Sequence, residues 1–285
     1  MIGLIAHNEK PGVENVLRSV IAELVRCDMP FAVEPHVAEM AGSVGAESVL
    51  PFETLAARSD TFITLGGDGT ILRLVYRLGD VLRPVFGINI GSLGFLTCAA
   101  PSEIAQMITA MRNGGYVLSE RTLLRAELLR DGKTLQTFHA LNDVVTGRGA
   151  RPEMVRLKLT LNGISLINYN ADGLIVATPT GSTAYSLSAG GPVLVPESKC
   201  FVVTPICPHV LTNRATVVGD DAVIEASVAE RSDDVVLTID GQDMTALKFG
   251  DTLRITKSDR IFPLAMLRPF PEILREKLKW SGSNI

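Results

Sequence analysis

The sequence contains few cysteines, and they lie far apart. The four are Cys27, Cys98, Cys200 and Cys207, and no two of them form a Cys-x-x-Cys pair. Structural zinc sites and disulfide frameworks need cysteines at regular or close spacing, so the sequence predicts neither. The histidines show no metal-ligand spacing either, and we expect no metal site built from protein side chains alone. A reducing cytoplasm is the compartment we expect.

Long apolar runs and a strong net charge are also lacking. No uncharged apolar stretch approaches the roughly 20 residues that a membrane-spanning helix needs. The apolar start of the chain, residues 1–7, has neither the basic region nor the cleavage site of a signal peptide. The formal net charge of -4, from 27 basic and 31 acidic residues, provides no electrostatic reason to expect a nucleic acid or an anionic membrane as partner.

The first third of the chain alternates between two hydrophobic patterns. Short apolar runs predict strands, and apolar residues at helical spacing predict helices between them. The predicted strands are residues 2–6, 31–37, 61–65 and 84–90, and the predicted helices are 13–25, 70–78 and 101–111. Ser102 is the expected N-cap of the last helix. This alternation indicates a parallel sheet covered by helices.

From about Leu118 the pattern changes to one strand after another. We predict strands at 124–129, 140–146, 157–161, 173–178, 202–205, 222–228, 235–239 and 253–256. Asp131-Gly132 and Asn162-Gly163 are hairpin turn signals between such segments. Residues 182–194 and 271–280 are the predicted helices of this part.

The predicted fold is therefore an α/β N-terminal domain with a parallel sheet, followed by a mostly antiparallel β domain. The C-terminal helix is expected to pack back on the first domain. We place the first domain at 1–117, joined by 266–285, and the β domain at 118–265.

A glycine-rich turn follows the strand predicted at 61–65. It consists of Gly66, Gly67, Asp68, Gly69 and Thr70. Glycines let the backbone approach a ligand and adopt positive φ, and the N–H groups of a strand-to-helix turn suit phosphate oxygens. An aspartate there would repel phosphate unless it accepts a proton from an attacking hydroxyl or holds Mg²⁺. The alternative is a tight turn in which Asp68 caps the helix.

A second glycine-rich segment, residues 87–94, contains Asn89 and follows a predicted strand. Its spacing, Gly-x-x-x-Gly-x-x-Gly, departs from the dinucleotide fingerprint, and the first turn lacks the Gly-Lys-Ser/Thr of a Walker A loop. Two interpretations stay open for this segment: a binding loop, or an ordinary glycine-rich end of a strand.

Two further segments carry polar groups next to apolar strands. Asn142 and Asp143 can hold the vicinal hydroxyls of a ribose, or form an Asx turn. Residues 172–192 run from Asp172 through a strand into Thr-Pro-Thr-Gly-Ser-Thr and a stretch of small and hydroxylated residues. Hydroxyls and helix N-terminal amides suit ribose and phosphate, and Tyr185 offers a ring for stacking. The alternative is a helix packed tightly through Ala and Gly. No Gly-x-Ser-x-Gly occurs, so a hydrolase is not supported.

These segments occur in the order found in the NAD kinases, and from about residue 60 onward the chain resembles that family. The resemblance implies transfer of the γ-phosphoryl group of ATP to the 2′-hydroxyl of the adenosine ribose of NAD, with Mg²⁺, giving NADP. Asp68 would be the proton acceptor, in a cleft between the two domains. A homodimer or homotetramer is implied. The nucleotide-binding residues implied are Gly66, Gly67, Gly69, Thr70, Asn89, Asn142, Asp143, Asp172, Thr183, Ala184, Tyr185, Ser186, Ser188 and Gln242.

The chain also departs from the family pattern. Asp143 stands where Glu is more common, and Asn170 stands where some relatives carry a basic residue. The segment 147–152, with Arg148 and Arg151, is particular to this chain, and the roles of these positions stay open. The competing hypotheses are a lipid kinase, for which an amphipathic membrane-facing helix is missing, and a nucleotide-binding regulator, which would have lost Asp68 or Asn142.

Overall fold

The computed structural model describes residues 1–7, 10–42, 44–45, 48–91, 94–151, 153–210, 212–229 and 234–280. Positions 92, 93, 152 and 281, which belong to segments named above, lie outside this part. The chain forms two compact units. We call residues 1–120 with 262–285 the α/β unit and residues 121–261 the β unit. Strands β5 and β16 each carry the chain from one unit into the other.

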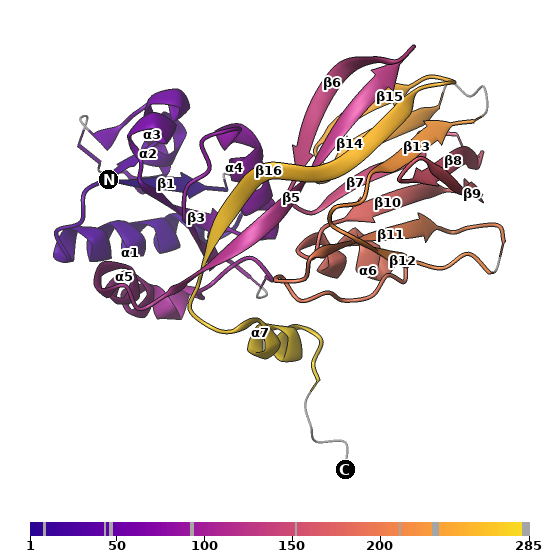
Figure 1. Cartoon of the computed structure of the whole chain (residues 1–285). Helices are drawn as coiled ribbons and strands as arrows, with labels where there is room; N and C mark the ends of the chain where they lie inside the picture. The colour runs from indigo at the N-terminus through magenta and orange to yellow at the C-terminus, as the bar shows by residue number, and fades with distance from the viewer. Residues whose placement is uncertain are drawn as a thin grey trace. The chain divides into compact units, whose positions relative to one another are not determined.

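The α/β unit contains a parallel sheet with helices on both faces. Its strands pair in the order β2-β1-β3-β4, and the end of β16 joins β4 in parallel at Leu264 and Val85. Helices α1 and α5 lie on one face of this sheet and α4 on the other (Figure 1). The elements are β1 (Ile2–Ala6), α1 (Val13–Arg26), β2 (Phe31–Val33), α2 (Pro35–Ala41), α3 (Phe52–Arg58), β3 (Thr61–Gly66), α4 (Asp68–Leu78), β4 (Val85–Asn89), η2 (Pro101–Glu103), α5 (Ile104–Asn113) and α7 (Phe270–Lys277).

The core of the α/β unit follows from the spacing of apolar residues. Helix α1 buries Val13, Leu17, Val20 and Leu24, which recur every three or four residues and so form one stripe. That stripe packs with the buried side chains of β1, β3, β4 and α5 in one hydrophobic cluster. Helix α7 belongs to the same unit, and the ring of its Phe270 lies 6.4 Å from that of Phe95. The C-terminal helix therefore packs back on the first part of the chain, as predicted.

The β unit contains two layers of antiparallel strands around a second core. One sheet has the order β12-β11-β10-β7-β14-β15, and the other pairs β16, β13, β8 and β9, with β5 against β16 and β6. Buried side chains of both sheets form one cluster. The elements are β5 (Val117–Arg130), β6 (Lys133–Ala140), β7 (Asp143–Arg148), β8 (Val155–Leu161), β9 (Ile164–Ala171), β10 (Gly173–Ala177), η3 (Gly181–Thr183), α6 (Tyr185–Ser188), β11 (Cys200–Ile206), β12 (Thr216–Gly219), β13 (Ile224–Val228), β14 (Val235–Ile239), β15 (Asp243–Leu247) and β16 (Thr252–Met266).

Both hairpin turns predicted from the sequence are confirmed. Asp131 and Gly132 join β5 to β6, with φ of 51° and 74°. Asn162 and Gly163 join β8 to β9, with φ of 51° and 78°. Two consecutive residues with positive φ match the right-handed twist of the paired strands, which explains the Asp-Gly and Asn-Gly pairs.

Three local predictions were wrong. The strand expected at 31–37 ends at Val33, because Pro35 begins α2, where its fixed φ suits the first helical position. Ser102 is not an N-cap: the turn begins at Pro101, and the Glu103 carboxylate accepts the Ala100 N–H at 2.7 Å. The helix expected at 182–194 is only the short η3 and α6, because Gly190 has φ of 88° and cannot continue a helix.

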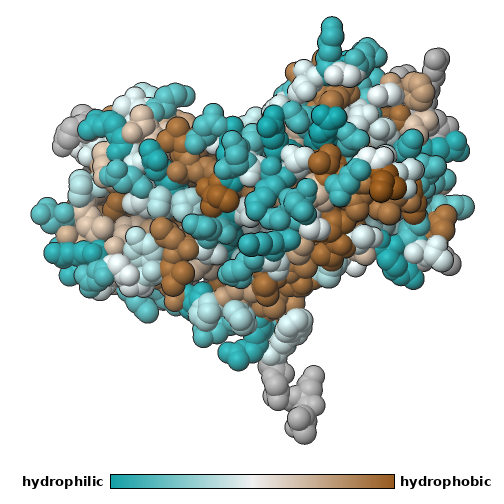
Figure 2. Space-filling view, in the orientation of Figure 1, coloured by the Kyte–Doolittle hydropathy of each residue, from teal (hydrophilic) through white to brown (hydrophobic). Residues whose placement is uncertain are grey.

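In the described part of the chain, no helix combines the length and the apolar character needed to cross a membrane. The space-filling view shows a mostly polar surface interrupted by apolar patches (Figure 2). Large apolar side chains exposed on the β unit include Ile164 and Met244, each 73% exposed.

We expect Gly163→Ala to lower the free energy of unfolding by about 1–2 kcal/mol, because an L-residue with a Cβ is disfavoured at this left-handed position. Urea unfolding measures the change. Gly115→Ala is the matched control: Gly115 has no positive φ, and an added Cβ would lie 3.6 Å from its nearest neighbour, an ordinary contact. Equal effects of the two substitutions would contradict the assignment of the turn.

Candidate functional site

The glycine turn lies where β3 ends and α4 begins. Gly67 is extended, with φ of -157°, and neither Gly66 nor Gly69 has positive φ. The expectation that positive φ requires these glycines was therefore wrong. Lack of space explains why position 66 is a glycine, because a Cβ on Gly66 would lie 2.0 Å from Oγ1 of Thr70. A Cβ on Gly69 would meet nothing within 4 Å, so that position stays open to a ligand.

The Asp68 carboxylate is held by the two residues that follow the second glycine-rich segment. Its Oδ2 accepts the N–H of Phe95 at 2.9 Å, and its Oδ1 accepts the N–H of Leu96 at 3.1 Å. Gly94 permits this approach, because a Cβ there would lie 1.9 Å from Oδ1. The two bonds orient the carboxylate, and each oxygen keeps a lone pair for a further donor.

A cavity of about 410 Å³ opens beside this turn. Residues lining it include His7, Lys10, Gly67, Asp68, Gly69, Thr70, Arg73, Asn89, Gly94 and Lys277. Basic side chains thus share the cavity with one carboxylate. Of the predicted site residues in the α/β unit, all but Gly66 line this cavity.

Lys10 is a basic group that lies against the turn. Its Nζ donates to the carbonyl oxygens of Gly66 at 3.0 Å and Ile90 at 2.7 Å. A Cβ on Gly67 would lie 3.2 Å from the same Nζ. The ammonium group, a donor of three hydrogen bonds, is therefore fixed directly over the backbone that the sequence assigned to phosphate.

In the β unit, Asn142 and Asp143 stand at the start of β7 and are buried. Their backbone N–H groups donate to Oδ1 of Asp240 at 2.7 and 2.9 Å. Oδ1 of Asn142 has no hydrogen-bond partner within the described ranges. The Nε2 atom of Gln242, two residues after Asp240, is likewise buried without a partner there. Unpaired buried polar atoms are rare, and a polar ligand would satisfy both.

Two carboxylates lie close together at this point. Burial, together with the smaller effect of the negative charge of Asp240, raises the pKa of Asp143 to about 7. Burial also raises the pKa of Asp240 to about 6, although three backbone N–H donors oppose that rise. Near neutral pH the Asp143 and Asp240 carboxyl groups together therefore hold a proton. A hydrogen-bond donor beside Asp143 would take the place of that proton.

Several hydroxyls of the block at 178–192 hold the fold together. Oγ1 of Thr178 donates to the Leu141 carbonyl at 2.6 Å, and Oγ of Ser182 donates to the Pro179 carbonyl at 2.6 Å. Ser186 is fully buried, with its Oγ 2.9 Å from Oγ1 of Thr204. Much of the hydroxyl density that suggested a ligand thus stabilises the turn itself.

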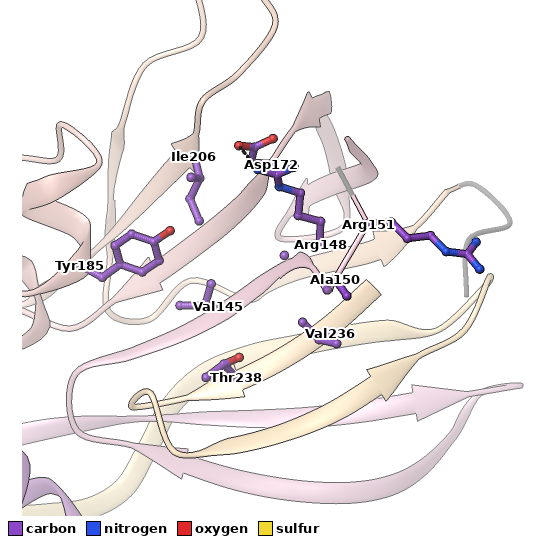
Figure 3. A pocket seen from close by; sticks show the side chains of 11 residues that line it. Val145, Arg148, Ala150, Arg151, Asp172, Tyr185, Ile206, Val236 and Thr238 are labelled. Carbon is purple, nitrogen blue, oxygen red and sulfur yellow. Dashed lines mark ion pairs between the residues drawn. The ribbon is translucent and has the colours of Figure 1, made fainter. Parts of the chain in front are cut away.

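A second cavity, of about 450 Å³, lies on the β unit and includes Asp172 and Tyr185 in its lining (Figure 3). The Arg148 guanidinium lies 3.4 Å from Oδ2 of Asp172, and the two side chains point toward one another, whereas Arg151 points away from them. Tyr185 is 46% exposed, and its ring faces the cavity.

The other predicted residues of the β unit divide by exposure. Thr183 and Ala184 are half-buried, Ser188 is exposed, and Asn170 is half-buried, with its carbonyl accepting the His209 N–H at 2.9 Å. No residue of this group lines the cavity of Figure 3.

Sequence reasoning missed several residues of these sites, among them Lys10, Arg148 and Asp240. Lys10 lies in an unremarkable N-terminal loop, and Arg148 in a segment whose role was left open. Asp240 directly follows the strand predicted at 235–239, where an Asp-Gly pair fits an ordinary turn. Its Asp-Gly-Gln pattern was visible, but no sequence signal indicated the partners at 141–143, nearly 100 residues earlier.

Comparisons with known proteins agree with this geometry. Residues 2–116 match the model of the ATP-NAD kinase N-terminal domain, and residues 141–267 match that of the ATP-NAD kinase C-terminal domain. The NAD kinase of Geotalea daltonii is 38% identical over 281 residues, and that of Syntrophotalea carbinolica is 39% identical over 281; in both cases 98% of each chain is covered.

Solved structures show the same fold. The crystal structure of yeast NADH kinase complexed with NADH superposes with a TM-score of 0.90 at 27% identity, covering 100% of this chain and 88% of that one. The structure of an Archaeoglobus fulgidus NAD kinase in complex with ATP superposes with a TM-score of 0.71 at 26% identity, covering 97% and 98%.

An α/β unit followed by an antiparallel β unit is the fold that this chain shares with these two solved kinases. The chain belongs to the NAD kinase family, since the two family models together match most of its length and the relatives match nearly all of it. The predicted family, the predicted enzyme class and the predicted fold are confirmed.

We expect the free energy of unfolding to fall between pH 5 and pH 8, and we expect Asp143→Asn to make that fall smaller. A carboxyl whose pKa is about 7 in the native state and about 4 in the unfolded state binds more protons when native. The free energy of unfolding therefore falls as pH rises through that window. Urea unfolding at both pH values should show a fall on the order of 2 kcal/mol larger in the native protein than in the variant.

The control for this prediction is Asp60→Asn, which removes an exposed carboxylate whose pKa is lowered by the N-terminal amine. Identical pH slopes in the native protein and in Asp143→Asn would show that Asp143 ionises normally.

Proposed function

We propose that this protein transfers the γ-phosphoryl group of ATP to the 2′-hydroxyl of the adenosine ribose of NAD, giving NADP. The observation that carries the proposal is the Asp68 carboxylate, held by two backbone N–H groups inside the cavity at the glycine turn. Family membership and the bound nucleotides of two relatives, NADH in one and ATP in the other, support it.

Asp68 acts as the general base in this proposal. It accepts the proton of the 2′-hydroxyl while that oxygen forms a bond to the γ-phosphorus, and the bond from that phosphorus to ADP breaks. Its two backbone donors keep the acceptor oxygen in place for this step.

Gly67 and Gly69 line the place for phosphate at the N-terminus of α4, where the first N–H groups of the helix and its dipole favour an anion. The Gly67 N–H itself donates to Oγ1 of Thr70 at 3.4 Å. Lys10 adds a fixed positive charge above that backbone. Mg²⁺ would neutralise charge on the phosphates. The phosphates themselves would carry this ion, with Asp68 as a carboxylate that lines the cavity.

The acceptor nucleotide is held by the β unit. The unpaired amide oxygen of Asn142 and the carboxylate of Asp143 accept hydrogen bonds from ribose hydroxyls, and Tyr185 offers its ring. We retain the remaining predicted contacts as part of the proposal: Gly66, Thr70, Asn89, Asp172, Thr183, Ala184, Ser186, Ser188 and Gln242. For buried Ser186 the proposal concerns its backbone or its support of the turn.

Incubation with Mg-ATP and NAD, with NADP read by an NADP-specific dehydrogenase, tests the proposal. Formation of NADP is the expected result, and its absence, with the protein folded, would refute the activity. Replacing ATP by polyphosphate and NAD by NADH in the same assay identifies the preferred donor and acceptor.

Asp68→Asn should slow turnover by roughly 10²- to 10⁴-fold, the usual contribution of a general base, and leave NAD binding nearly unchanged. Single-turnover kinetics and calorimetric titration with NAD separate the two effects. Asp60→Asn, which removes another carboxylate of the α/β unit, is the control. Unchanged turnover with lost binding would make Asp68 a positioning group and the assignment wrong.

Asp143→Ala should raise the KM for NAD, because the ribose loses a charged acceptor, and leave the KM for ATP unchanged. Steady-state kinetics with each substrate varied in turn measures both. Asp220→Ala, on the surface of the same unit, is the control. A KM for NAD equal to that of the native protein would remove Asp143 from the site.

The cleft location, the domain limits at 1–117 with 266–285 and at 118–265, the cytoplasmic location and the homodimeric or homotetrameric assembly stay predictions.

A further inference from the structure

The Asp240 carboxylate accepts three consecutive backbone N–H groups. The N–H of Leu141 donates to Oδ2 at 2.7 Å, and those of Asn142 and Asp143 donate to Oδ1 at 2.7 and 2.9 Å. The N–H of Asp240 donates in return to the Asp143 carbonyl at 3.0 Å. Asp240 reaches these groups from a left-handed conformation, with φ of 49°, at the end of β14. This segment is thereby tied to a turn about 98 residues away in sequence.

The carbonyl side of the same segment is held independently. The Thr178 N–H donates to the Asn142 carbonyl at 2.9 Å, and Oγ1 of Thr178 donates to the Leu141 carbonyl at 2.6 Å. Gly181 packs against it so closely that a Cβ would lie 2.0 Å from the Asn142 oxygen. The backbone at 141–143 is therefore restrained from both sides, while Oδ1 of Asn142, with only 9% of the residue exposed, keeps no partner within the part described.

We propose that Asp240 is a positioning residue for the acceptor nucleotide. By fixing the backbone of Leu141, Asn142 and Asp143, it holds the Asn142 amide oxygen and the Asp143 carboxylate in the arrangement that accepts ribose hydroxyls. This inference rests on the proposed function, and Asp240 acts through the two side chains without contacting the nucleotide.

A carboxylate suits this task better than an amide. Both of its oxygens accept, so three N–H groups find partners, whereas an asparagine would turn an N–H₂ group toward at least one of these donors. The choice also places a half-buried negative charge beside Asp143, with no cation among the groups that shift either pKa. A second negative charge beside Asp143 is unfavourable for stability, and the effect of Asp240 on the site explains why it is retained.

Asp240→Asn and Asp240→Gly test the proposal. Asparagine and glycine both tolerate the left-handed backbone, so the first removes part of the acceptor set and the second removes all of it. We expect Asp240→Asn to raise the KM and the Kd for NAD about tenfold, as loss of one hydrogen bond to a charged group implies, and Asp240→Gly to raise them more. The KM for ATP should not change, and amide exchange at 141–143 should accelerate.

Glu103→Gln is the matched control. It removes a carboxylate that also accepts a backbone N–H, but in the α/β unit at the start of α5. Its KM for NAD and its exchange at 141–143 should equal those of the native protein.

Two results would overturn the inference. One is faster exchange at 141–143 with unchanged KM and Kd for NAD. The other is a lower kcat at unchanged KM for both substrates, which marks loss of folded enzyme alone. Calorimetry measures the Kd for NAD without turnover. If the native protein binds NAD but forms no NADP, the proposed function is refuted. The Kd values of the Asp240 variants still decide the role of Asp240 in that case.

Discussion

Backbone N–H groups near the ends of strands need acceptors, and in both units an aspartate carboxylate supplies them. Asp68 accepts two such groups from Phe95 and Leu96, and Asp240 accepts three from residues 141–143. Each carboxylate fixes a loop that carries polar groups, because an unpaired buried N–H is costly and so holds its acceptor in place. The geometry proposed for phosphate and for ribose depends on these five hydrogen bonds.

Small and hydroxylated residues make these close approaches possible. Gly94 admits the Asp68 carboxylate, and Gly181 admits the Asn142 carbonyl. Thr178 and Ser182 use their hydroxyls to close the turn at 178–182 on its own backbone. Composition that suggests ligand contact thus has a structural part, whereas Gly69 and the exposed ring of Tyr185 stay open.

Charge is distributed differently in the two units. Lys10 is bound to two carbonyl oxygens above the glycine turn, which suits an anionic ligand. Asp143 is a buried acid and Asp240 a half-buried one beside it. Arg148, the last residue of β7, pairs with Asp172, which directly precedes the adjacent strand β10. Buried acceptors favour a ligand that donates hydrogen bonds, as ribose hydroxyls do. The charge of the α/β unit therefore suits an anionic group, and the acceptors of the β unit suit ribose hydroxyls.

The sequence by itself determined the family, the order of an α/β part and a β part, both hairpin turns and the candidate residues, because periodicity, turn chemistry and motifs are local properties. It did not determine that the helix expected at 182–194 is short, nor that positive φ plays no part at Gly66 to Gly69. It also left Lys10 and Asp240 without a role. Their partners are 56 or more residues away in sequence, and only the tertiary structure decides which donors and acceptors meet across that separation.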